Sequence, residues 1–476
     1  MIHISTSFAL LVVAIIILVC IAGSRLSGRL GVPTLFIFIM LGMLFGSDGI
    51  FKIPFGNFAL AEQVCSVALI FIMFYGGFGT RWSEAKPVAG RSILLSSAGV
   101  VLTAFLTGLF CHLVLKMALM EGMLLGAVLG STDAASVFSI LRSRKLNLKY
   151  GTASMLELES GSNDPFAYMM TVILLSAMTG SVSGGSAVLL LIRQLAFGLL
   201  TGAAVAWLVT WLLKRYAFYG EGFDTIFVFA AAIISYALAS QIGGNGYLSV
   251  YLTGIILGNQ ELKNQKALVG FFDAFTGMMQ MLLFFLLGLL AFPSQMPSIV
   301  LPAIAIALFL TFVARPAAVG LLLAPSKPPI GQYLVISWAG LRGAASIVFA
   351  IMATLSEGYM KYDIFHIVFC VVLFSIIFQG SLLPKVAEKC DMIDNSTDVM
   401  RTFSDYTGDM QIQFVQLPIG DNHPWKNRKI CEIEMLPGML ITVIRRGAQT
   451  IVPKGQTVIL EGDTVVLGAE GSVSYT

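Results

Sequence analysis

Long apolar runs alternate with short polar connections over the first 390 residues of the chain. About 20 apolar residues suffice for a helix to cross the hydrocarbon core of a bilayer, so the runs predict about thirteen membrane-spanning helices. The second run is short, and a count of twelve or fourteen would also fit. The limits are 4–23, 33–47, 60–79, 91–115, 119–141, 151–178, 187–213, 224–241, 246–259, 269–291, 299–323, 333–356 and 363–388.

The charges in the connections predict how the chain is oriented. Alternate connections carry basic clusters, such as Arg81, Lys86 and Arg91. The connections between them hold isolated lysines, such as Lys52 and Lys116. Cytoplasmic connections are the ones enriched in Lys and Arg, which places the N-terminus outside and the C-terminus in the cytoplasm. We therefore expect a multi-pass protein of a bacterial plasma (inner) membrane, with an odd number of spans.

The pattern changes near residue 390, from long apolar runs to short alternating segments. The segments 440–444, 457–460 and 464–467 are rich in β-branched residues and are separated by turns that contain glycine, which predicts strands. The fold class expected is therefore an all-α polytopic membrane protein followed by a small, mostly β cytoplasmic domain. We place the transmembrane domain at 1–390 and the cytoplasmic domain at 391–476.

Composition supports a membrane protein and excludes several functions. The chain is 57% hydrophobic and 12% charged, against about 25% charged in soluble domains. Its net charge of +3 gives no reason to expect a nucleic-acid partner. Six cysteines and four histidines show no metal-binding spacing, so we expect no structural metal and no cofactor. No phosphate-binding loop and no nucleophile–base pair is evident, which argues against an ATP-driven pump and an enzyme.

The apolar run 151–178 contains Glu159, Ser160, Asn163, Asp164 and Pro165. An Asp at the bilayer centre costs roughly 3 kcal/mol on insertion scales, so such residues mark function. On a helix, residues four positions apart lie on one face, so carboxylate, hydroxyl and amide oxygens form a strip. This strip suits a small cation or a proton. The alternative is that Asp164 only pairs with a buried arginine.

Two further runs are interrupted near their middle. Thr132 and Asp133 follow two glycines in run 119–141, and Arg342 lies between two glycines in run 333–356. Corresponding interrupted spans in two halves of a chain indicate an inverted-repeat transporter with its site at the breaks. For Asp133, an ordinary hydrogen bond between helices is the alternative.

Arg315 is the remaining charge within an apolar run. An isolated guanidinium there would be costly, so we expect a carboxylate partner, and Glu159 is the natural candidate. That pairing would leave Asp164 to bind a ligand. Alternatively, Arg315 lies near the cytoplasmic surface and extends its side chain toward water.

As a set, these residues resemble the NhaP-type monovalent cation–proton antiporters over about residues 1–390. The resemblance implies two inverted repeats, two crossed broken helices and a homodimer in the membrane. The motifs are Gly130-Ser-Thr-Asp133, Glu159-Ser-Gly-Ser-Asn-Asp-Pro165, Ala314-Arg-Pro316 and Gly340-Leu-Arg-Gly-Ala344.

The resemblance also implies roles for the residues of these motifs. Asp164 would alternately bind the proton and the transported cation. The other ligands of the cation would be Ser160, Asp133 and the main chain of Thr132, and Asn163 would support them. The transported monovalent cation would be the only metal bound.

Two further implications concern charge. Glu159 and Arg315 would form a structural ion pair, and Arg342 would compensate the helix dipoles at the crossing. Asn163 occupies the position of a second Asp in electrogenic relatives, which implies one-for-one, electroneutral exchange.

The tail is similar to the C-terminal lobe of RCK (TrkA-C) domains, through Ile444-Arg-Arg-Gly447, Ile451-Val-Pro-Lys-Gly455 and Glu461-Gly-Asp463. This resemblance implies the potassium–proton subgroup and regulation by an unidentified cytoplasmic ligand. We therefore expect K⁺/H⁺ exchange by alternating access. The alternatives are Na⁺(Li⁺)/H⁺ exchange by the same fold and a ligand-gated cation channel, although no potassium-channel filter sequence is present.

Overall fold

The computed structural model describes residues 6–30, 33–143, 146–181, 184–215, 222–262, 265–356, 360–394, 412–421, 423–433, 435, 439–447 and 449–470. The chain divides into two compact units, Met1–Ser404 and Asp405–Thr476. The predicted boundary between residues 390 and 391 stays a prediction.

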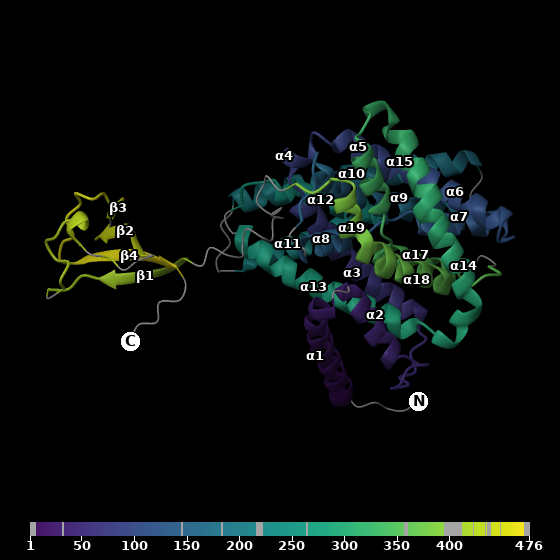
Figure 1. Cartoon of the computed structure of the whole chain (residues 1–476), viewed down its shortest axis with the longest axis horizontal. Helices are drawn as coiled ribbons and strands as arrows, with labels where there is room; N and C mark the ends of the chain where they lie inside the picture. The colour runs from purple at the N-terminus through teal and green to yellow at the C-terminus, as the bar shows by residue number, and fades with distance from the viewer. Residues whose placement is uncertain are drawn as a thin grey trace. The chain divides into compact units, whose positions relative to one another are not determined.

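The first unit is a bundle of helices (Figure 1). Within the described residues, seven helical segments are long and apolar enough to cross a membrane, and five apolar helices are shorter. Together with α9, they fall one in each of the thirteen predicted runs. The α-helices are α1 (Thr6–Leu30), α2 (Thr34–Phe45), α3 (Phe58–Gly79), α4 (Trp82–Ala85), α5 (Ala89–Leu94), α6 (Val100–Leu113), α7 (Leu119–Val128), α8 (Ala134–Ser143), α9 (Thr152–Met178), α10 (Gly184–Arg215), α11 (Phe223–Gln241), α12 (Gly246–Gly258), α13 (Gln265–Leu290), α14 (Met296–Phe309), α15 (Arg315–Leu323), α16 (Ile330–Trp338), α17 (Ala344–Leu355), α18 (Ile364–Phe374) and α19 (Ser381–Lys389).

Two helices are broken, as expected, and the breaks cross. The segment 129–133 separates α7 from α8, and 339–343 separates α16 from α17. The Asp133 amide donates a hydrogen bond to the Leu341 carbonyl at 2.8 Å. A Cβ on Gly343 would lie 2.4 Å from the Asp133 Cβ, so only glycine permits this approach.

The helices that form the crossing follow the same order in the two halves of the unit. Each half contributes a long helix, then a broken helix, then a helix beside the break. The long helices α5–α6 and α14–α15 each contain one π-helical turn, at Leu95–Gly99 and at Leu310–Ala314. A third π turn, Ser375–Gly380, joins α18 to α19. The shared order supports the inverted repeat, and π turns are common at functional sites.

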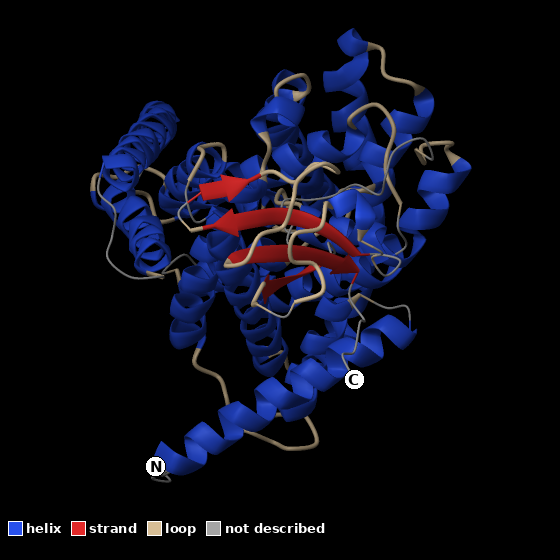
Figure 2. Ribbon diagram, turned by 90° about the vertical axis from the view of Figure 1, so that its left-hand side faces the viewer, coloured by secondary structure: helices blue, strands red, loops and turns tan. Residues whose placement is uncertain are grey.

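The second unit is an antiparallel four-stranded sheet with the order β1-β4-β2-β3, drawn in red in Figure 2. The strands are β1 (Ile412–Pro418), β2 (Met439–Arg446), β3 (Gln449–Ile451) and β4 (Asp463–Glu470). The predicted strands 440–444 and 464–467 lie within β2 and β4.

The prediction of a strand at 457–460 is wrong. This segment forms an isolated bridge between Val458 and Lys429. The Ile459 amide donates to the Arg428 carbonyl at 3.0 Å, and the Asn427 amide donates to the Ile459 carbonyl at 2.8 Å. Its backbone groups therefore bond to an irregular loop and not to the sheet, although the buried Ile459 side chain belongs to the domain core.

Candidate functional site

The crossing and α9 form one side of a cavity of about 540 Å³. Facing them are residues of α3 and α13, including Tyr75 and Asp273. Four carboxylates line the cavity, and no Lys or Arg is among its described lining residues. The carboxylates belong to Asp133, Glu157, Asp164 and Asp273.

Asp164 and Asp133 face this cavity from different elements. The Ser131 hydroxyl donates a hydrogen bond to Asp164 Oδ1, so among the described residues Asp164 contacts a hydroxyl and is not paired with an arginine. Asp133 precedes α8 and accepts hydrogen bonds from the Ser136 amide at 3.2 Å and from its hydroxyl at 2.5 Å. Asp133 is thus the N-cap of α8, where a negative charge is favoured by the helix dipole.

Asn163 and Ser160 hold the unwound segment beside α9. The Thr132 amide donates to Asn163 Oδ1 at 3.3 Å, and the Asn163 side-chain amide donates back to the Thr132 hydroxyl. The Ser160 hydroxyl donates to the Thr132 carbonyl at 2.6 Å. Ser160 and Thr132 also line the cavity, whereas Asn163 is only 1% exposed and does not. The geometry gives Asn163 a supporting position.

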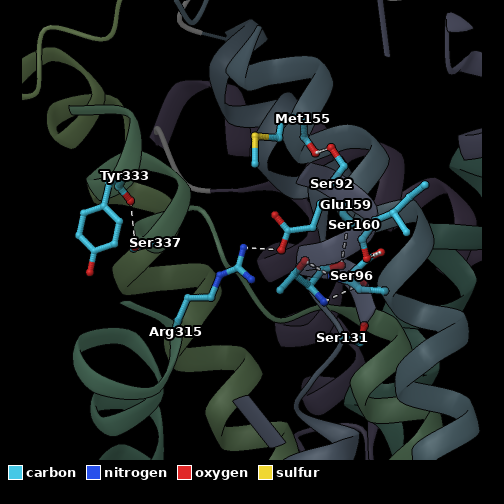
Figure 3. A network of polar contacts seen from close by, with 12 residues as sticks. Ser92, Ser96, Ser131, Met155, Glu159, Ser160, Arg315, Tyr333 and Ser337 are labelled. Carbon is cyan, nitrogen blue, oxygen red and sulfur yellow. Dashed lines mark hydrogen bonds and ion pairs between the residues drawn. The ribbon is translucent and has the colours of Figure 1, made fainter. Parts of the chain in front are cut away.

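Glu159 points away from the cavity, toward Arg315 (Figure 3). Arg315 Nη2 lies 2.5 Å from Glu159 Oε1, and the two side chains are 5% and 1% exposed. Arg315 therefore lies inside the protein and does not extend to the surface. Its side chain also packs on Gly340, where a Cβ would lie 3.0 Å from Arg315 Nε. The pair links α9 and α15 to the second break.

Arg342 is buried at the crossing, with 3% of its surface exposed. Its guanidinium donates to the carbonyls of Leu129 and Ser131, the latter at 3.0 Å. These carbonyls lie at the C-terminal end of α7, where the helix dipole is negative, so the positive charge is favourable there. The Arg342 amide donates to the Ser375 hydroxyl in the third π turn at 3.0 Å.

The structure brings to the cavity further residues that were not among the predicted site residues. Ser131 lies within a quoted motif, but its contact with Asp164 carries no sequence signal because hydroxyls are ordinary in membrane helices. Asp273 was detectable, since it is a carboxylate inside the predicted run 269–291. It accepts a hydrogen bond from the Tyr75 hydroxyl at 3.0 Å. Tyr251 was not detectable, since only the packing of its ring on Gly161 places it there.

Comparison with known proteins agrees with this geometry. Residues 14–389 match the family model of the transmembrane sodium/hydrogen exchanger, and residues 414–472 match the TrkA-C domain. The chain is 36% identical over 382 residues to the K(+)/H(+) antiporter NhaP of Alkalimonas amylolytica, covering 80% of this chain and 66% of the relative. It is also 36% identical over 383 residues to the K(+)/H(+) antiporter NhaP2 of Shewanella oneidensis, covering 79% and 66%. The chain thus spans 66% of the length of these curated relatives.

A solved structure shares the fold. It is the sodium proton antiporter MjNhaP1 from Methanocaldococcus jannaschii at pH 8, which matches with a TM-score of 0.71 and 23% sequence identity. The match covers 81% of this chain and 99% of the other. At this identity the likeness concerns the fold alone.

Proposed function

The chain belongs to the sodium/hydrogen exchanger family, and from this we propose that it is an electroneutral secondary antiporter that exchanges one monovalent cation for one proton. The observation that carries the proposal is the position of Asp164. Its carboxyl group faces a cavity with no Lys or Arg among the described lining residues, while the neighbouring Glu159 pairs with Arg315.

Exchange follows from competition for one carboxylate. An ionised carboxylate in a poorly solvated site needs a compensating charge, which a proton or a cation can supply. Since both occupy the same carboxylate, each displaces the other. The cation would also bind oxygens of Asp133, Ser160 and the Thr132 carbonyl. Asn163 beside it is uncharged and cannot take up a second proton, so one proton is exchanged for one cation at Asp164 and no net charge moves.

Alternating access is supported by where the cavity lies. It extends toward the end of the bundle at which α3 ends and α9 begins, and nearby connections carry Arg81, Lys86 and Lys149. By the positive-inside rule this end is cytoplasmic. One turn beyond Asp164 on α9, the Tyr168 ring packs 5.1 Å from Tyr247 and 5.8 Å from Phe349, measured between centroids. These rings would close the path to the outside.

We further propose a homodimer in the bacterial plasma membrane, with the N-terminus outside and the C-terminal domain in the cytoplasm. K⁺ is the proposed cation, because the relatives named above are K⁺/H⁺ antiporters and because the chain carries a TrkA-C domain. The TrkA-C domain would regulate exchange by binding a cytoplasmic ligand.

The proposal is tested in proteoliposomes by recording proton flux on addition of K⁺, Na⁺ or Li⁺, with and without an imposed voltage. We expect a proton flux in response to K⁺ that does not depend on the imposed voltage. This flux should be lost in Asp164→Asn, while the melting temperature stays that of the unsubstituted protein. Asp391→Asn is the matched control, because Asp391 is exposed and its ion pair with Lys149 contributes little. Exchange by Asp164→Asn at the rate of the unsubstituted protein would refute the proposal. A response to Na⁺ alone would change the cation, and cation flux without proton movement would indicate a channel.

A further inference from the structure

A second cavity, of about 390 Å³, lies at the other end of the same helices. Phe58 at the start of α3, Thr354 near the end of α17 and Phe292 just after α13 line it. The first cavity is lined by Tyr75 on α3, Ala344 on α17 and Asp273 on α13. The two cavities therefore lie toward opposite ends of α3, α13 and α17. By the proposed orientation, the second cavity lies on the outer side.

His366 lines this outer cavity and is only 3% exposed. The Phe292 amide donates a hydrogen bond to His366 Nε2 at 3.1 Å, so Nε2 is the acceptor. His366 Nδ1 lies 2.6 Å from Asp363 Oδ2, so it carries the hydrogen and donates it. Since one ring nitrogen accepts and the other donates, the contacts select the neutral imidazole with its hydrogen on Nδ1.

The contact with Phe292 joins two groups of helices. Phe292 lies in the connection between α13, which packs on α2 and α3, and α14, which packs on α18. Two residues further along, the Ser294 amide and hydroxyl donate to Asp48 Oδ2, which follows α2. The connection is thus held by His366 from the α18 side and by Asp48 from the α2 side.

We propose that His366 and Asp363 form a proton-binding site at the outer end of the exchange path, and that a proton bound at His366 releases Phe292 and opens this end. The proposal rests on the proposed exchange function. The proton comes from the outer water and binds the Nε2 lone pair. Nε2–H and the Phe292 N–H are then two donors facing each other, so their hydrogen bond is lost, while Asp363 stabilises the imidazolium.

Several charged groups lie near His366 at this end of the bundle. Asp363 on its own helix and Asp48 from the segment after α2 both interact with it electrostatically. Lys361 lies at the same rim, where its amide donates to the Glu121 carboxylate. Of these two carboxylates, that of Asp363 contacts His366, whereas that of Asp48 accepts hydrogen bonds from Ser294. The Lys361 ammonium group lies over the Tyr362 ring. The contact with Phe292 needs an unprotonated Nε2, so a proton arriving from the outer water would break it.

The first test compares exchange in membrane vesicles of both orientations while the pH is varied on one side only. We expect the exchange rate to rise when the outer side is acidified from pH 8 to 6. In His366→Gln this increase should be roughly fivefold smaller, because the free energy of one hydrogen bond corresponds to a change of about that size. The response to inner pH should not change. His112→Gln is the control, because His112 lies on the same predicted side but its Nδ1 contacts the Met117 carbonyl outside the cavity. Equal responses of all three proteins to outer pH would overturn the proposal.

A second measurement does not require exchange. In detergent, labelling of Ile364→Cys by a maleimide is compared with labelling of the exposed native Cys431, which corrects for thiol ionisation. Ile364 lines the outer cavity and is 2% exposed. We expect the labelling ratio to rise roughly fivefold from pH 8 to 6 with His366 present and to stay constant with His366→Gln. A ratio that is constant in both proteins, or rises equally in both, contradicts the proposal. If the unsubstituted protein showed no exchange of a cation for a proton, the proposed function would be contradicted instead.

Discussion

At the scale of single residues, α9 separates two carboxylates by function. Glu159 points to Arg315 on one face of the helix, and Asp164 faces the cavity on another. Both were conspicuous in the sequence because a charge within an apolar run is costly, which also made Arg315 and its partner predictable. The hydrogen bond from Ser131 was not predictable, because nothing in the spacing between residues 131 and 164 encodes which hydroxyl meets the carboxylate.

The ion pair predicts an asymmetric effect of substitution. Arg315→Leu leaves the Glu159 carboxylate buried without its counter-charge, which should destabilise the protein by about 3–5 kcal/mol. The double variant Glu159→Leu with Arg315→Leu removes both charges and should recover most of that loss. Thermal unfolding in detergent checks this by comparing the single variants, the double variant and the unsubstituted protein. Additive losses in the double variant would show that the two residues do not act as a pair.

At the scale of helices, the breaks were predictable and the contacts were not. Glycines and polar residues in the middle of runs 119–141 and 333–356 indicated both interruptions. The sequence did not indicate the π turns, because one extra residue in a turn hardly alters the pattern of an apolar run. These turns are Leu95–Gly99, Leu310–Ala314 and Ser375–Gly380. Close helix approaches were equally hidden, since a glycine at a contact and a glycine facing outward look alike in sequence.

Two glycines illustrate that difference and provide a test. A Cβ at Gly254 on α12 would lie 2.3 Å from the Phe74 carbonyl oxygen of α3, and backbone cannot move aside as a flexible side chain can. Gly254→Ala should therefore destabilise the protein by about 1–3 kcal/mol. Gly270→Ala on α13 is the matched control, with nothing within 4 Å of its Cβ, and should be neutral or slightly stabilising. Melting temperatures in detergent distinguish the two, and equal shifts would argue against close α3–α12 packing.

At the scale of the whole molecule, the chain combines a membrane unit and a small sheet domain, and the change in hydropathy pattern near residue 390 was enough to predict both. Within the sheet domain, alternation correctly indicated β2 and β4. It failed at 457–460 because a buried Ile459 produces the same alternation whether its backbone joins the sheet or a loop. Side-chain pattern reports burial, and hydrogen-bond partners follow only from the tertiary structure.

The sheet domain contains a buried carboxylate whose titration should control its stability. Arg446 donates two hydrogen bonds to Asp463, from Nε and Nη2, both at 2.8 Å, and the Leu460 amide donates a third at 2.8 Å. The hydrogen bonds from Arg446 outweigh the effect of burial and hold the pKa of Asp463 below its ordinary value. A carboxyl group with a lowered pKa in the folded state stabilises the fold above its unfolded pKa of about 4, and this contribution is lost as the pH falls below it.

We therefore expect the urea midpoint of this domain to be steady from pH 7 to about 5 and to fall below about pH 4. The full chain is used, with Trp425 kept and the other four tryptophans replaced by Phe, so that fluorescence reports this domain. Arg446→Ala should lower its stability at pH 7 by about 1.5 kcal/mol and weaken the acid dependence. Lys426→Ala is the control, because the described ion-pair partners of Lys426 are the exposed Asp421 and Glu461, and such pairs contribute little. If Arg446→Ala kept the full acid dependence, a carboxyl group other than Asp463 would be responsible for it.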